Sequence, residues 1–173
     1  MTISVLCFLS SLLLLSLSGA TIINSQIPIH QYNPSSWLFR ERKHEVSFYR
    51  FLRINRWKDY LPQNNRTFSK RNIETFNDPD YIHTFALQTC RGETVHFLLG
   101  LFSFPLTAYA LLAPDPVRAF FVLLKLWGIF ATCQWPFIWV QRYNRPRLLQ
   151  LEKVIRRRQE RMRPTDSSAP RIV

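Results

Sequence analysis

The stretch that decides the fold runs from His96 to Val140 and reads HFLLGLFSFPLTAYALLA PDPVR AFFVLLKLWGIFATCQWPFIWV. Its first block, residues 96–113, carries no Asp, Glu, Lys or Arg over eighteen residues. A helix of that length spans roughly 27 Å, and the hydrocarbon core of a bilayer takes about 20 helical residues. Pro114-Asp115-Pro116 predicts a tight turn, and a second apolar block, Ala119–Val140, follows it. The stretch therefore predicts a helical hairpin in the bilayer and an all-α membrane protein.

The second block of the hairpin is interrupted by Lys125 and Gln134. A lysine at mid-bilayer costs roughly 2.5–3.5 kcal/mol on insertion scales, but Lys125 is close enough to the turn to extend its amine to the surface. We expect Pro105 to kink the first block. An aromatic stripe spaced four residues apart indicates the membrane–water boundary where the second block ends: Trp135, Trp139 and Tyr143.

The composition of the chain also favours a membrane protein. It has 173 residues, of which 47% are hydrophobic, yet its formal net charge is +12. The apolar residues stand in long uncharged blocks with the basic residues between them, a partition typical of membrane proteins. The chain contains none of the motifs of nucleic-acid-binding folds, so we expect no nucleic-acid partner. Three widely spaced cysteines predict neither a disulfide framework nor a metal site, and we expect no cofactor.

The amino-terminal segment, Ile3–Ile23, is an apolar run long enough to cross the bilayer. Ser18-Gly19-Ala20 within it resembles the small-residue cleavage site of a signal peptide. No Lys or Arg precedes the run, however, and signal peptides usually begin with positive charge. The sequence favours an uncleaved membrane anchor, with a signal peptide as the alternative.

Residues 24–95 form a polar region that is rich in aromatic residues and mixed in charge. Trp37–Trp57 has apolar residues at helical spacing. Asp78-Pro79 predicts the start of a helix, with Asp78 as N-cap and Tyr81–Arg91 as its body.

A basic amphipathic helix is predicted over residues 141–163, because Pro146 suits the first turn of a new helix and Pro164 ends it. One face of this helix is apolar and consists of Leu148, Leu151, Val154 and Ile155. The other face is basic and consists of Lys153, Arg156, Arg157, Arg158 and Arg161. We expect it to lie on anionic membrane lipid, and the alternative is an ordinary surface helix. Residues 164–173 are predicted to be a disordered tail.

The distribution of charge predicts the orientation. From Gln141 onward there are ten Lys and Arg against three acidic residues, whereas the turn Pro114–Arg118 has one of each. Because basic residues remain on the cytoplasmic side, the C-terminus is predicted to be cytoplasmic in a multi-pass cell-membrane protein. The hairpin then places residues 24–95 on the same side.

A first polar cluster lies where the chain enters the hairpin. Glu93 and His96 are i,i+3 neighbours if this stretch is helical, and Thr89 falls on the same stripe. A carboxylate beside an imidazole is the minimum set for general-base activation of a hydroxyl, with His96 taking the proton and Glu93 orienting the ring. The competing interpretation is a local ion pair at the membrane boundary. Cys90 as nucleophile with His96 as base is disfavoured, because the two side chains point roughly 120° apart on a helix.

A second polar cluster lies where the chain leaves the hairpin. It is rich in hydrogen-bond donors and consists of Gln141, Arg142, Tyr143, Asn144, Arg145 and Arg147. Such a set suits a phosphate or carboxylate ligand, although it also suits simple anchoring by positive charge. The antiparallel hairpin places both clusters on one face of the membrane. His30, His44 and His83 lack partners at useful spacing, and we interpret them as ordinary surface or interfacial histidines.

Several segments resemble the glycosyl-4,4'-diaponeurosporenoate acyltransferases, which complete a staphyloxanthin-type carotenoid pathway. The most specific segment is the second cluster through Leu148, followed by the basic run that ends at Arg161. Arg56-Trp57-Lys58 and the positions of Arg91, Glu93 and His96 are also similar, in the same order. The sequence departs from the family pattern at two positions, with Gln88 in place of Glu and Gly92 in place of Ala.

The resemblance implies an enzyme that esterifies a sugar hydroxyl of a membrane-embedded carotenoid glycoside, or of a glycolipid, with a fatty acyl group. The donor would be a cytosolic fatty acyl thioester. We hypothesise that His96 deprotonates the hydroxyl in this reaction and that Glu93 orients it. Arg91, Arg142 and Arg145 would bind donor phosphates or the oxyanion. The rival hypothesis is a non-catalytic membrane protein that assembles enzymes of lipid or pigment synthesis.

Overall fold

The computed structural model describes residues 2–61 and 77–162, and the tail predicted over 164–173 lies outside the described residues. The described ranges contain helices and no strand, which confirms the all-α prediction. The α-helices are α1 (Thr2–Gln26), α2 (Lys43–Phe51), α3 (Ile54–Trp57), α4 (Pro79–Phe102) and α5 (Pro116–Met162). Two further segments, η1 (Ile29–Gln31) and η3 (Phe104–Leu112), are 3-10 helices.

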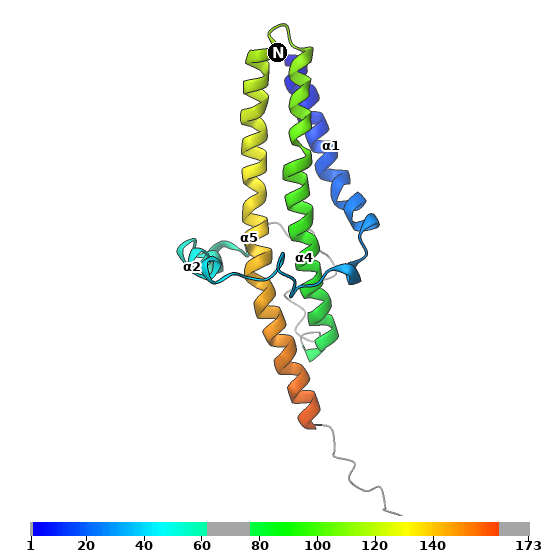
Figure 1. Cartoon of the computed structure of the whole chain (residues 1–173), viewed down its shortest axis with the longest axis vertical. Coiled ribbons are helices and arrows are strands. Elements are labelled where there is room, and N and C mark those ends of the chain that lie inside the picture. Colours follow the sequence, from blue (N-terminus) through cyan, green and yellow to red (C-terminus); the bar gives the residue numbers. More distant parts are fainter. Residues whose placement is uncertain (1, 62–76, 163–173) are drawn as a thin grey trace, which may run out of the picture.

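The predicted hairpin is formed by two long antiparallel helices. Helix α4 with η3 leads to the turn, and α5 returns alongside it (Figure 1). Helix α1 leans against the same pair, with its amino terminus near the turn (Figure 1). Among the described residues, three helical stretches are long and apolar enough to cross a membrane: Thr2–Ile23, Pro79–Leu112 and Pro116–Met162.

The start and the end of α4 follow from local chemistry. The side chain of Asp78 accepts a hydrogen bond from the backbone N–H of Asp80, so the predicted N-cap is confirmed. At the other end the α-helix gives way to the 3-10 helix η3 at Ser103. Pro105 has no N–H for an α-helical hydrogen bond, and its ring would clash with the carbonyl four residues earlier. The indole N–H of Trp127 donates a hydrogen bond to the backbone carbonyl of Gly100, so this carbonyl oxygen has a partner where the α-helix ends.

The helix break predicted at Pro146 is absent, because α5 is continuous through both Pro136 and Pro146. A proline inside a helix costs about 3 kcal/mol in a lost hydrogen bond and steric clash. Arg145 and Leu148, on either side of Pro146, are both buried. This packing outweighs the local preference, so the predicted separate interfacial helix is the last third of α5.

This last third of α5 packs on the beginning of α4. Leu148 and Ile155 are buried in a cluster with Ile82 and Ala86. Arg156 donates to Asp80 at 2.7 Å and to Glu152 at 3.0 Å. Of the predicted apolar face, Leu148 and Ile155 are thus buried against α4, whereas Leu151 and Val154 are exposed. The segment continues the line of α5 beyond the hairpin (Figure 1), and its contact with anionic lipid stays a prediction.

Helix α1 packs closely on the hairpin. Phe8 is fully buried against Ala110, Ala119 and Leu123. The hydroxyl groups of Ser11 and Tyr109 lie 2.9 Å apart. Farther along, Gly19 is buried, and a Cβ built there would lie 2.8 Å from Cδ2 of Leu99. The absence of a side chain at Gly19 thus allows α1 to approach α4.

We expect α1 to remain part of the mature protein. The small-residue site Ser18-Gly19-Ala20 is inside helix α1, and its Gly19 is packed against Leu99 of α4, whereas a processing protease needs an accessible, unwound segment. The mass of the intact protein, isolated from membranes and measured by mass spectrometry, checks this. A mass that lacks the first 20 residues contradicts it and makes the segment a signal peptide.

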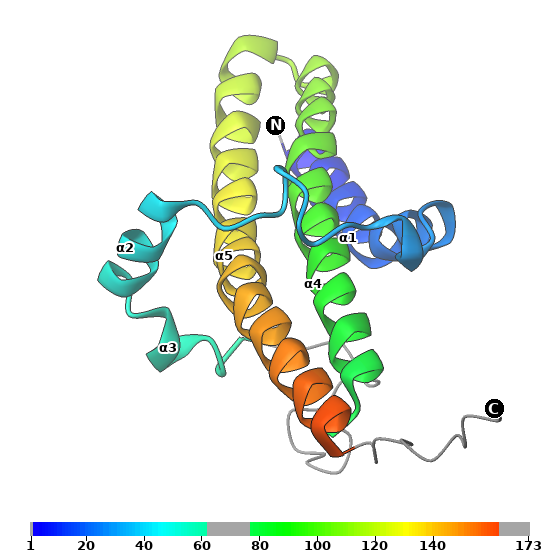
Figure 2. The same cartoon turned by 60° about the horizontal axis from the view of Figure 1, so that its bottom comes forward.

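The chain between α1 and α4 wraps around the hairpin. Residues 27–57, named the belt here, leave the end of α1, cross α4 and α5, and place α2 and α3 on the far side of α5 (Figure 2). Tyr49 and Ile54 of the belt are buried with Val140 of α5. The predicted helical stretch Trp37–Trp57 is confirmed only in part, since the helices begin at Lys43 and are interrupted at Arg53, which has a left-handed φ of 51°.

Candidate functional site

The two predicted polar clusters meet in a buried ion-pair network centred on Glu93. One oxygen of the Glu93 carboxylate accepts from Nε of Arg142, and the other accepts from a terminal nitrogen of Arg145, each at 2.6 Å. Arg145 is 1% exposed. Thr89 accepts from Nε of Arg145 at 2.9 Å. The predicted convergence of the two clusters on one end of the hairpin is thus observed.

The same two arginines hold the belt. Arg142 donates to the backbone carbonyl of Leu38 and to the carboxylate of Glu45, both at 2.5 Å. Arg145 donates to the carbonyl of Phe39 at 2.6 Å, and its guanidinium lies 5.1 Å from the centre of the Phe39 ring. Every contact involves a charged donor, and such hydrogen bonds are about twice as strong as neutral ones. The network therefore fixes the belt across the hairpin.

A cleft of about 640 Å³ opens beside this network, between the belt, α4 and α5. Its volume lies in the range of sites for small organic ligands, roughly 300–1,000 Å³. The apolar part of the lining consists of Leu38, Phe39, Phe48, Tyr49, Phe97, Leu98, Trp135, Ile138 and Trp139. The polar part consists of Arg42, His44, Glu45, Glu93, Thr94 and Arg142. The cleft is thus apolar over most of its lining, with a charged group of side chains from the belt and the network.

Aromatic side chains form the wall that the belt shares with α5. Phe48 meets Trp139 edge to face, with ring centres 5.2 Å apart, and Trp135 lies 6.3 Å from Trp139. Tyr49 donates to Glu45 at 3.1 Å. Burial, together with the negative charge of Glu45, raises the pKa of the Tyr49 hydroxyl above its usual range. Tyr49 therefore remains a proton-bearing donor that orients Glu45.

Glu93 and His96 do not form the predicted pair with each other. Both oxygens of Glu93 are bound by arginine, as described above. The imidazole of His96 lies between the helices, with Nδ1 2.9 Å from Oε1 of Gln134 and its ring stacked on Phe137 at 4.6 Å. His96 is also absent from the lining of the cleft. The catalytic role of this pair stays a prediction, and the geometry places the two side chains in separate contacts.

Of the predicted ligand-binding residues, Arg142 alone lines the cleft. Arg91 donates to the carbonyl of Ile27 and thereby ties the start of the belt to α4. The side chain of Arg147 is exposed and stacks on the ring of Tyr143. Gln141 lies against Gly92, where an added Cβ would come within 3.2 Å of the Gln141 amide.

The remaining two residues of the second cluster belong to the wall of α5. Tyr143 meets Tyr49 edge to face at 6.1 Å, and Asn144 is half-buried. Neither residue lines the cleft. The second cluster therefore contributes mainly contacts within the protein.

The sequence pattern did not indicate the side chains that the belt contributes to the cleft. Arg42, His44 and Glu45 all line the cleft. They stand at the start of a short helix in a polar region, where spacing gives no indication of a distant partner. In the described residues no group of three His, Cys, Asp or Glu side chains is placed to hold a metal ion.

The fold and the site define a helical membrane protein with an apolar cleft. Charged side chains line one part of this cleft, where the chain leaves the apolar hairpin. The family model of glycosyl-4,4'-diaponeurosporenoate acyltransferase matches residues 30–154, more than half of the chain. The chain belongs to this family, as the resemblance in the sequence predicted.

Two relatives of that name show the degree of similarity. A Staphylococcus haemolyticus protein is 33% identical over 116 residues, which cover 65% of this chain and 62% of the relative. The chain thus spans less than two thirds of that relative. A Staphylococcus aureus protein is 28% identical over 151 residues, which cover 80% of this chain and 82% of the relative. No solved structure matches the chain significantly.

Proposed function

We propose that the protein is a membrane acyltransferase, which esterifies a sugar hydroxyl of a glycosylated carotenoid with a fatty acyl group from a thioester donor. The observation that carries this proposal is the apolar cleft with charged side chains at one part of its lining. The names of the relatives support the same reaction class. No cofactor is needed, because the thioester itself supplies the activated acyl group.

The two parts of the cleft suit the two parts of such a donor. Phe97, Leu98 and Ile138 offer an apolar surface on which an acyl chain can be buried. Arg42 and Arg142 at the polar part offer guanidinium groups for the phosphates of a carrier or for the oxyanion of the transition state. The acceptor would remain in the bilayer with its polyene in lipid, and only its sugar would reach the polar part.

We further propose that the charged part of the cleft faces the cytoplasm. The network and the basic last third of α5 lie at the end of the hairpin opposite to the turn (Figure 1). Cytoplasmic loops carry the excess of Lys and Arg in membrane proteins. A cytosolic thioester would then reach the cleft directly, and anionic lipid of the inner leaflet would be attracted to the same basic side.

The test is acyl transfer in inside-out membrane vesicles from cells that do or do not produce the protein. A labelled long-chain acyl thioester and a glycosylated carotenoid are supplied, and the esterified product is separated by chromatography. We expect the ester only in vesicles that contain the protein. The pigment profile of the same cells should change from the free glycoside to its ester.

The rival function is a non-catalytic scaffold for enzymes of pigment or lipid synthesis. The engagement of Arg91, Arg142 and Arg145 in contacts within the protein favours it. A scaffold would change the pigment profile of cells, but the purified protein in defined vesicles would form no ester. Ester formation by the purified protein would exclude this rival.

A further inference from the structure

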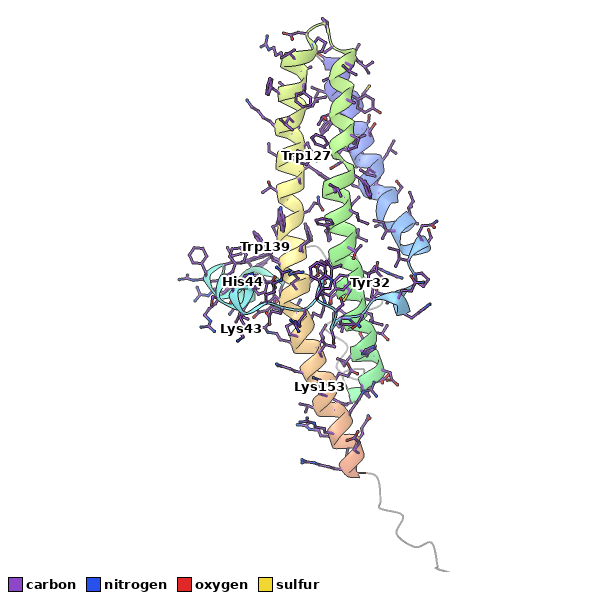
Figure 3. All side chains as sticks on the ribbon, viewed as in Figure 1. Tyr32, Lys43, His44, Trp127, Trp139 and Lys153 are labelled. Atoms are coloured by element: carbon purple, nitrogen blue, oxygen red, sulfur yellow. The ribbon has the colours of Figure 1, made fainter. Side chains whose placement is uncertain are left out.

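We propose that His44 is the general base that deprotonates the acceptor hydroxyl, an inference that rests on the proposed acyl transfer. His44 is the second residue of α2 and lines the cleft. Figure 3 shows it on the belt, and Trp139 of α5 lines the same cleft. The structure thus assigns the role to a histidine that the sequence pattern did not distinguish.

The other histidines are occupied or lie elsewhere. The chain has four histidines, and His44 is the one that lines the cleft. His83 lies 3.1 Å from Glu152, and His96 lies 2.9 Å from Gln134. His30 is exposed on η1, away from the cleft lining. His44 is therefore the histidine that can contact a ligand in the cleft.

The imidazole of His44 is free to contact a ligand. It is exposed, and it has no hydrogen bond or ion pair to another described residue. Glu45, its sequence neighbour on the cleft, differs in this respect, since the Glu45 carboxylate is held by Arg142 and Tyr49. A general base must reach the proton that it removes, and a side chain already bound on both sides cannot do so.

The placement also orders the reactants. An acyl chain on Phe97 and Leu98 directs its thioester carbonyl toward the polar part of the cleft, where His44 and Arg142 stand. The sugar hydroxyl approaches the same carbonyl from the open side. His44 is then near the hydroxyl, while a guanidinium is near the carbonyl oxygen.

The step balances without any further reactant. A neutral ring nitrogen of His44 takes the hydroxyl proton as the sugar oxygen forms a bond to the thioester carbon, and the negative charge moves to the carbonyl oxygen. The carbonyl then re-forms as the carbon–sulfur bond breaks. The leaving thiolate takes the proton from the imidazolium, so that ester and thiol are released and His44 is neutral again.

The experiment compares wild type, His44→Ala and His30→Ala, each purified and reconstituted in vesicles with the long-chain thioester and the glycosylated carotenoid. We expect His44→Ala to lower kcat by about 10²- to 10⁴-fold, the range of general-base catalysis, with KM for the donor little changed. Added imidazole should restore part of the activity to His44→Ala, because the cleft is open. His30→Ala, an exposed histidine outside the cleft, serves as the matched control and should act as wild type does.

Each other outcome overturns the assignment. If His44→Ala keeps its activity within about threefold, or if imidazole restores nothing, His44 is not the base. The same holds if His96→Ala is inactive while His44→Ala is active. If the wild type itself forms no ester, both the proposed function and the role of His44 are overturned. If the wild type and His44→Ala are both active, only the role of His44 is overturned.

Discussion

Replacing Arg145 with alanine is expected to lower the free energy of unfolding by about 3–5 kcal/mol, the usual cost of removing one partner from a buried ion pair. Arg145 is 1% exposed and donates to Thr89, Phe39 and Glu93. The substitution leaves a buried carboxylate with one cationic partner fewer and removes a tie to the belt. Unfolding of the purified protein in detergent, followed by circular dichroism, measures the change.

Arg147→Ala is the matched control, two positions farther along the same helix. The side chain of Arg147 is exposed and stacks on Tyr143, so its loss should cost at most about 1 kcal/mol. We also expect a protease to cut the belt sooner in Arg145→Ala than in Arg147→Ala. Equal stability of the two variants would show that the network does not hold the fold.

A double variant separates the cost of the unpaired charge from the loss of contacts. Replacing Arg145 by Met and Glu93 by Leu removes both charges and keeps apolar volume, and such replacements are often neutral in other buried pairs. Arg142 retains Glu45 as its partner in this variant. We expect the double variant to be more stable than Arg145→Ala, although the belt still lacks its bond to Phe39.

The hairpin could be predicted because its signal is contained within one segment. The uncharged block 96–113 is long enough to cross a bilayer, and Pro114-Asp115-Pro116 ends it. The structure places α4 with η3 and α5 where these residues indicate. The cap at Asp78 is local in the same sense, since it depends on one side chain and the next turn of backbone.

The belt could not be predicted, because what holds it is distant in sequence and partly independent of side-chain identity. Arg142 and Arg145 bind the backbone carbonyls of Leu38 and Phe39, and any residue at those positions offers the same carbonyl. Sequence spacing also did not predict the contact of His96 with Gln134. The spacing correctly placed Glu93 and His96 on one stripe of α4, but both side chains form hydrogen bonds with residues of α5.

One signal for the true partner of His96 was present. Gln134, like Lys125, interrupts the second apolar block of the hairpin, and His96 begins the first block. A polar side chain inside a bilayer segment needs a partner on a neighbouring helix, and the antiparallel hairpin provides that neighbour. The observed contact of 2.9 Å between the two side chains fits this reasoning.

Filling the cleft is expected to slow the transfer of long acyl chains strongly without unfolding the protein. Leu98 lines the cleft on α4 and is only half-buried, so that tryptophan at this position extends into the space beside Ile138. We expect Leu98→Trp to lower transfer from a long-chain thioester by about 100-fold, the scale that a 1 Å misplacement of reacting groups can cause. A two-carbon thioester needs little of the cleft and should be transferred at close to the wild-type rate.

Leu101→Trp provides the control on the same helix, because Leu101 is 52% exposed and does not line the cleft. Tryptophan is tolerated on a lipid-facing surface, so this variant should transfer both donors as wild type does. Chain-length profiles of the three proteins in vesicles decide the matter. An unchanged long-chain rate in Leu98→Trp would mean that the acyl chain lies outside the cleft. A selective loss of long-chain transfer would show that the acyl chain of the donor binds in the cleft, since only a chain that occupies the apolar lining is affected by a substitution there.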